Sequence, residues 1–170
     1  MVSILAVSDV HGAKYYNLYL EALKKISVEN FGNLIIFGGD MVYKGNVESL
    51  RPIVKVTLEC LGKEVKILSV FGNEEYDDVK KRLIDEYPEI TWLDDELLIL
   101  EVDDVRIGFV GTRGCLDRPT KWQRKNIPGI EEIYSSRVKK VEFLLKKSLS
   151  SADTTVLVSH YSVTYLTLLG

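Results

Sequence analysis

Residues 4–12 of the chain, "ILAVSDVHG", pass from a short apolar run directly into Asp9 and His11. A short run of aliphatic and β-branched side chains is typical of a buried strand. Asp9 and His11 are spaced i, i+2, and His11 is one of only two histidines in the chain. The stretch therefore predicts a buried strand that ends in a carboxylate and an imidazole.

The pattern around this strand repeats along the first half of the chain. Apolar runs at 2–7, 33–37 and 65–71 predict three strands. Amphipathic stretches separate them, and helices are expected at about 15–26, 50–61 and 76–87. The apolar stripe of the first helix consists of Tyr15, Leu18, Tyr19, Ala22, Leu23 and Ile26. Strands that alternate with helices in this way predict βαβ units and a parallel sheet.

The pattern changes after Pro88. Segments 97–102 and 105–110 read as an antiparallel hairpin that turns at Asp103-Asp104. A long loop is expected at 111–129, a helix at about 131–149 and a last strand at 154–159. The sequence therefore predicts an α/β fold with mixed strand directions.

Each strong strand ends in a residue type that binds metal ions. The second strand leads into Asp40, the third into Asn73 and the last into His160. In open α/β sheets, ligands gather beyond the carboxyl ends of the strands, so residues far apart in sequence converge there. Each short motif alone is common by chance, but the shared position of all of them, with both histidines used, favours a metal site.

Four short motifs occur in a fixed order along the chain: "SDVHG", "GGD", "GNEE" and "SHY". Together they resemble the fingerprint of the calcineurin-like metallophosphoesterases, and the resemblance spans residues 1–160. It implies a four-layer βαβ sandwich with mixed sheets flanked by helices, formed by residues 1–170 as a single domain.

The resemblance also implies a metal-ligand set. Asp9 and His11 would bind one metal, Asn73 and His160 a second, and Asp40 would bridge the two. Carboxylate, amide and imidazole ligands suit Mn, Fe, Zn, Co or Ni. Two such cations would activate a hydroxide that attacks a small phosphodiester or phosphomonoester. The implied function is a metal-dependent phosphoesterase.

Two departures from the fingerprint bear on catalysis. Glu74 stands where much of the family has a histidine, and Glu74 and His160 are the catalytic candidates. Glu74 could act as a general acid if its surroundings raised its pKa. It could instead be a helix-start carboxylate that faces the dipole of the helix at 76–87.

The second departure is that the family's Gly-His-x-His motif does not occur before Gly170. We therefore expect an incomplete domain, a weakly bound second metal and slow hydrolysis. The tail is apolar, with Tyr161, Val163, Tyr165, Leu166, Leu168 and Leu169. Such a surface favours association, so we expect a homo-oligomer that covers it.

The segment 111–129 is the most basic part of the chain. We expect it to cap the site, with Arg113, Arg118 and Arg124 pairing with substrate phosphate. Trp122 would stack on a base or ring. The alternative is a solvated surface loop in which Trp122 packs as an anchor.

Composition limits the classes of partner. The net charge of −3 gives no general attraction to nucleic acid and counts against a nuclease. A nuclease is still an alternative, because the family that the chain resembles includes nucleases and the basic loop supports one. A catalytically weak protein-binding scaffold of the same fold is the other alternative, favoured by Glu74 and the missing motif.

Location follows from the same composition. No apolar run reaches the length of about 20 residues that spans a bilayer, so we expect no membrane partner. Cys60 and Cys115 lack metal-type spacing, and reduced thiols in the cytoplasm are the expectation. The chain has a single glutamine and abundant Lys and Glu, a composition that weakly favours a heat-adapted source.

Overall fold

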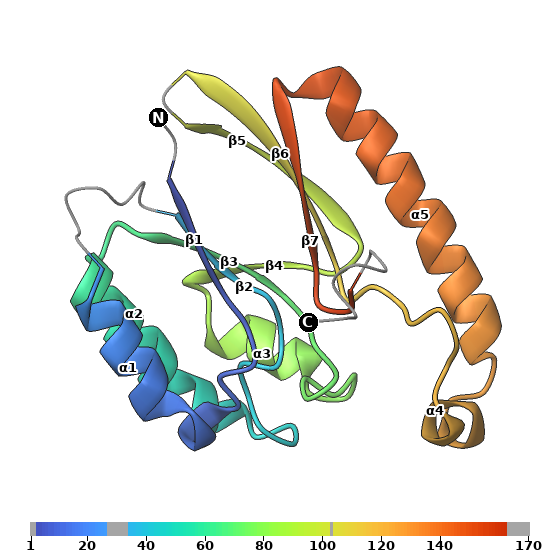
Figure 1. Cartoon of the computed structure of the whole chain (residues 1–170), viewed down its shortest axis with the longest axis horizontal. Coiled ribbons are helices and arrows are strands. Elements are labelled where there is room, and N and C mark those ends of the chain that lie inside the picture. The colour runs from blue at the N-terminus through green and yellow to red at the C-terminus, as the bar shows by residue number, and fades with distance from the viewer. Residues whose placement is uncertain (1–2, 27–33, 103, 163–170) are drawn as a thin grey trace. The chain divides into compact units, whose positions relative to one another are not determined.

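The computed structural model describes residues 3–26, 34–102 and 104–162. They fall into two compact units, Met1–Trp92 and Leu93–Gly170, whose elements are drawn in Figure 1. The apolar tail on which the oligomer prediction rests lies mostly outside the described residues, because 163–170 are not among them.

The first unit is built on a four-stranded sheet. Its order is β1 (Ile4–Val7), β2 (Leu34–Phe37), β3 (Lys66–Val70) and β4 (Ile90–Leu93). The pairs β1–β2 and β2–β3 are parallel, which confirms the predicted βαβ units. All four side chains of β2 are buried, as expected for a central strand covered on both faces. The strand β4, "ITWL", was not predicted.

Two helices, α1 (Tyr16–Lys24) and α2 (Arg51–Leu61), lie side by side in Figure 1. Tyr19 and Leu23 of α1 and Ile53 of α2 are buried in one core with β2. The predicted stripe of α1 is wrong in part, because Leu18 is 65% exposed and Tyr15 is 39% exposed. The helix places Tyr16 and Leu20 against the core instead.

The third helix of this unit, α3 (Lys80–Glu86), is shorter than the predicted helix at 76–87. It begins six residues after Glu74, so Glu74 does not lie in its first turn. The interpretation of Glu74 as a helix-start carboxylate is therefore wrong for this helix.

The second unit contains a three-stranded sheet of mixed direction. The hairpin β5 (Glu96–Val102) and β6 (Val105–Thr112) is antiparallel, as predicted, and β7 (Thr154–Ser159) runs parallel to β6. Helix α5 (Ile130–Ser151) packs on this sheet. A Cβ on Gly108 of β6 would come within 1.9 Å of the Ser148 hydroxyl of α5, so glycine permits this close approach.

The predicted loop at 111–129 contains a helix, α4 (Lys121–Asn126). A capping box starts it, because the Thr120 Oγ1 atom accepts from the Gln123 backbone N–H at 3.1 Å and Gln123 Oε1 accepts from Thr120 N–H at 2.8 Å. Trp122 is 66% exposed, so the alternative in which it packs as an anchor is wrong.

The structure confirms the predicted fold class, α/β with parallel and mixed sheets flanked by helices. Within the described residues, every helix is too short or too polar to cross a bilayer.

Candidate metal centre

Three predicted metal ligands meet at one edge of the first sheet. Asp9 and His11 follow β1, and Asp40 follows β2, its parallel neighbour. Each of the three offers a ligand atom within 4.8 Å of the other two. The His11 Nε2 atom lies 3.7 Å from the Asp9 Oδ1 atom. The register of the parallel sheet thus brings two carboxylates and one imidazole together.

Backbone hydrogen bonds extend the pairing of these strands into the site. Asp9 N–H donates to the Gly39 carbonyl at 3.1 Å, and His11 N–H donates to the Asp40 carbonyl at 2.9 Å. The segments after β1 and β2 are therefore fixed to each other by the main chain. The positions from which the three ligand side chains extend are set by these bonds.

All three residues hold left-handed backbone conformations. The φ angles are 59° for Asp9, 50° for His11 and 53° for Asp40. Residues other than glycine adopt this region at a cost, and such strain is concentrated at functional sites. Three strained residues that also converge in space indicate a site under functional constraint.

The donor set fits a divalent transition metal. The exposed fraction is 3% for the whole Asp40 residue, and it is 17% for the side chain of His11 and 55% for that of Asp9. The site is therefore reached from the side of Asp9. The buried Nδ1 atom of His11 has no hydrogen-bond partner among the described residues, and a buried polar atom of this kind is costly unless a ligand or ion satisfies the ring. Two carboxylates and one imidazole suit Mn, Fe, Zn, Co or Ni.

Glu75 supports the backbone of the site through hydrogen bonds, and the sequence analysis did not predict this role. It is fully buried, and its carboxylate accepts four backbone N–H groups at 2.6–3.1 Å, from Asp40, Met41, Val42 and Gly72. Burial raises the pKa of Glu75, and these backbone donors oppose that shift. The available signal was its place in the motif "GNEE", directly after the third predicted strand.

The turn after β3 approaches Asp40 closely. Glu74 N–H donates to Asp40 Oδ1 at 2.8 Å. A Cβ on Gly72 would lie 2.1 Å from the same oxygen, so only glycine allows this contact. The Glu74 carboxylate accepts from Lys44 N–H at 2.6 Å, and the predicted ligand Asn73 is exposed on this turn.

His160 lies in the second unit, directly after β7. Its backbone N–H donates to the Thr112 carbonyl at 3.3 Å, which continues the pairing of β7 with β6. Its ring is half-buried, 5.2 Å from the ring of Tyr161. The roles predicted for Asn73 and His160 as ligands, and for Glu74 and His160 in catalysis, stay predictions.

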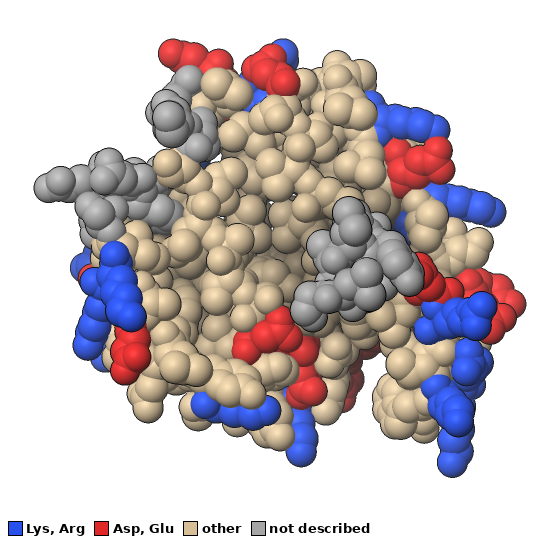
Figure 2. Space-filling view, viewed as in Figure 1, with Lys and Arg blue, Asp and Glu red and all other residues tan. Residues whose placement is uncertain are grey.

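The predicted phosphate-binding arginines are divided between two environments. Arg118 and Arg124 line one cavity of about 470 Å³, together with Asp117 and Tyr134. Arg113 lies at the end of β6, where its carbonyl accepts from Tyr161 N–H at 3.0 Å. Figure 2 shows Lys and Arg side chains gathered over α4, which supports the predicted basic character of this segment.

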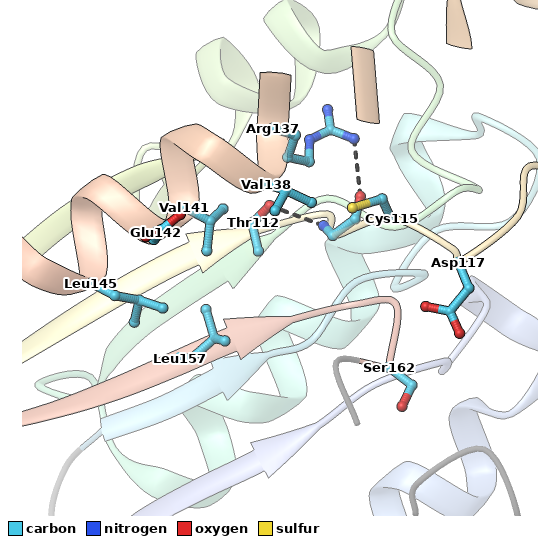
Figure 3. A pocket seen from close by; sticks show the side chains of 11 residues that line it. Thr112, Cys115, Asp117, Arg137, Val138, Val141, Glu142, Leu145, Leu157 and Ser162 are labelled. Carbon is cyan, nitrogen blue, oxygen red and sulfur yellow. Dashed lines mark hydrogen bonds between the residues drawn. The ribbon is translucent and has the colours of Figure 1, made fainter. Parts of the chain in front are cut away.

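A neighbouring cavity of about 400 Å³ is mainly apolar (Figure 3). Val141 and Leu145 of α5 face Leu157 of β7 across it. At its polar end, the Arg137 guanidinium donates to the Gly114 carbonyl at 3.0 Å and to the Asp95 carboxylate at 3.0 Å. This network ties the segment after β6 to α5.

Solved structures of low sequence identity resemble the chain. A hypothetical protein from Thermus thermophilus is 17% identical, with a TM-score of 0.55 over 91% of this chain and 56% of that chain. A protein of unknown function from Aquifex aeolicus is 16% identical, with a TM-score of 0.47 over 96% of this chain and 82% of its own. A novel archaeal phosphodiesterase is 22% identical, with a TM-score of 0.40 over 68% of this chain and 59% of its own. The Thermus protein shares the fold.

The sequence as a whole places the chain in a family. No curated protein matches it at a significant level. The model of the calcineurin-like phosphoesterases, however, matches residues 2–168, nearly the whole chain. The match includes the strand ends that carry Asp9, His11 and Asp40. The chain therefore belongs to the calcineurin-like phosphoesterase family.

Proposed function

We propose that this protein is a metal-dependent phosphoesterase that hydrolyses a small phosphodiester or phosphomonoester. The observation that carries the proposal is the convergence of Asp9, His11 and Asp40 within 4.8 Å of one another. Family membership supports the reaction class. All three residues also hold the strained backbone of a functional site.

Asp9, His11 and Asp40 would hold the metal. A bound divalent cation supplies Lewis acidity, which stabilises negative charge on phosphoryl oxygens. Asp40 is nearly fully buried and accepts from Glu74 N–H, so its carboxylate is oriented before any ligand arrives. Asp9 is the most exposed of the three, so substrate would approach the metal from its side. A second metal on Asn73 and His160 stays a prediction.

Glu74 makes contacts that would position the loop beside the centre, in addition to its predicted role as a general acid. Its carboxylate accepts from Lys44 N–H and its carbonyl accepts from Gly45 N–H at 2.9 Å. Arg113, Arg118 and Arg124 remain the proposed phosphate partners, and Trp122, exposed on α4, remains a proposed ring contact.

Hydrolysis of bis(p-nitrophenyl) phosphate and p-nitrophenyl phosphate tests the proposal. Protein stripped with chelator should be inactive, and added Mn²⁺ should restore activity. Asp40→Asn should remove that activity, while Asp85→Asn, a change on the exposed face of α3, should leave it intact. Tight Mn²⁺ binding without hydrolysis of either ester would favour the scaffold alternative. Absence of metal binding would overturn the proposal.

The remaining expectations stay proposals with their own tests. Competition by single-stranded DNA addresses the nuclease alternative. Sedimentation addresses the expected homo-oligomer. The cytoplasmic location and the heat-adapted source also stay predictions, and both cysteines are free thiols.

A further inference from the structure

Two tyrosines flank the imidazole of the candidate metal centre. The ring centroids of Tyr15 and Tyr43 each lie 6.0 Å from that of His11, with interplanar angles of 66° and 84°. Both tyrosines are 39% exposed. Tyr15 had been expected in the apolar stripe of α1, yet it contacts His11. The rim of the centre is therefore aromatic on two sides.

Two lysines lie against these rings. The Lys14 Nζ atom is 4.8 Å from the centroid of Tyr15 and 5.9 Å from that of Tyr43. The Lys44 Nζ atom is 5.1 Å from the centroid of Tyr43. Because one ammonium group lies within 6 Å of both rings, the two rings border a common space. Two ammonium groups border that space, which adjoins the candidate metal ligand His11.

Neither tyrosine belongs to the hydrophobic core of the first unit. Cation–π contacts at exposed sites are weak. A planar group could displace the ammonium groups from the ring faces at small cost. The displaced lysines would then be able to pair with phosphate oxygens of the same ligand.

We propose that Tyr15 and Tyr43 form a subsite for a planar ring, and that the substrate is a phosphoester carrying such a ring, as a nucleotide does. The inference rests on the proposed function, because it assigns the organic group of the substrate. A base stacks on an aromatic side chain through its π-face, so the subsite accepts different bases. Lys14 and Lys44 add affinity for the anionic part of the same molecule.

The test compares two ligands that differ only by the base. AMP and ribose 5-phosphate are titrated by calorimetry into the metal-free protein, so that binding is measured without turnover. AMP should bind about ten-fold more tightly, the effect of one base on one aromatic platform. In the double variant Tyr15→Leu, Tyr43→Leu, this ratio should fall close to one. The double variant with Phe at both positions keeps the rings and should keep the ratio.

Activity separates failure of this inference from failure of the proposed function. The native protein could hydrolyse p-nitrophenyl phosphate with metal and yet bind AMP and ribose 5-phosphate with nearly equal affinity. That result would overturn the ring subsite alone. An AMP preference that survives in the Leu variant would also overturn it, since another surface would then bind the base. An AMP preference that depends on the rings, in a protein inactive with every metal, would refute the phosphoesterase and retain the subsite.

Discussion

Glu75 supports the candidate site through hydrogen bonds to its backbone, without being one of the predicted ligands. Its buried carboxylate accepts hydrogen bonds from backbone N–H groups of the segments after β2 and β3, including that of Asp40. Hydrogen bonds to a charged acceptor are stronger than neutral ones. The strained conformation of Asp40 is thus stabilised by a side chain that no substrate has to reach.

We predict that Glu75→Gln destabilises the fold by about 3 kcal/mol, because an amide oxygen cannot replace a carboxylate that accepts four donors. Urea unfolding measures this change. Glu59→Gln, on the exposed face of α2, is the matched control and should shift stability by less than about 0.5 kcal/mol. Equal effects at the two positions would show that the buried hydrogen bonds are not important to stability.

Asp40 should be the most sensitive ligand. We predict that Asp40→Asn weakens Mn²⁺ binding by more than about 100-fold, since even the loss of a group that orients a ligand costs about 10–100-fold. The amide oxygen can still accept from Glu74 N–H, so the fold should persist. Calorimetry measures the affinity, and unchanged binding by Asp40→Asn would remove this residue from the metal site.

Glu74→Gln distinguishes positioning from proton transfer. An amide oxygen can still accept from Lys44 N–H, so a positioning role predicts a loss of less than about three-fold on every ester. A general acid would instead lose about 100-fold or more on esters with poor leaving groups, and little on nitrophenyl esters. Rates for alkyl and nitrophenyl phosphates, measured side by side, decide between the two roles.

At the level of single residues, the sequence predicts the clustering of three candidate ligands better than it predicts the residues that support them. Asp9, His11 and Asp40 follow strands, and the register of a parallel sheet brings strand ends together. The roles of Glu75 and Tyr15 depend on contacts between loops, which no local period encodes. Tyr15 also matches the spacing of the apolar stripe, although it lies just before the first turn of α1.

Individual elements follow local rules where those rules are strong. The hairpin β5–β6 and helix α5 were predicted from alternation and apolar spacing. Helix α4 was missed although its Thr120-x-x-Gln123 capping box is readable in the sequence, because Gly and Pro around it are typical of loops. Strand β4 was missed because Thr91 interrupts its apolar residues, whereas β1 and β2, which are equally short, are continuously apolar.

The contact between α1 and α2 includes a buried hydrogen bond between Tyr19 and Thr57, and its contribution to stability depends on pH. Thr57 Oγ1 donates to the Ile53 carbonyl, so it accepts from the Tyr19 hydroxyl at 2.7 Å. Burial raises the pKa of Tyr19 from 10.0 to about 12. The folded state keeps the proton that the unfolded state loses above pH 10, so the stabilisation is complete below pH 10 and is lost as the pH rises towards 12.

We predict that the stability of the native protein falls by about 2–3 kcal/mol more than that of Tyr19→Phe between pH 10 and 12. Urea unfolding at a series of pH values measures the difference, and comparison with the variant cancels the titration of other groups. If the stabilities of the two proteins changed with pH in parallel, burial would not raise the pKa of Tyr19.

For the whole molecule, the family resemblance read from four motifs is confirmed by the match over residues 2–168. Each motif alone is weak evidence for the family. Their order along the chain and their shared position at strand ends carry the resemblance. What sequence could not give is the division of the described residues into two units, since no linker composition marks the boundary near Trp92. All three clustered candidate ligands belong to the first unit, so we predict that metal binding is local to that unit.

Hydrogen exchange with and without Mn²⁺ tests that local character. At a metal concentration of about 100 times the dissociation constant, binding should stabilise the folded state by about 2.7 kcal/mol. Added protection should appear in residues 4–12 and 38–46, which carry Asp9, His11 and Asp40, and β5 should exchange as before. Protection of residues 154–162 only at higher metal concentration is the result expected if His160 binds a second, weaker ion. Protection confined to the second unit would contradict the assignment of the ligands, and the Asp40→Asn protein, which should show no added protection anywhere, is the control.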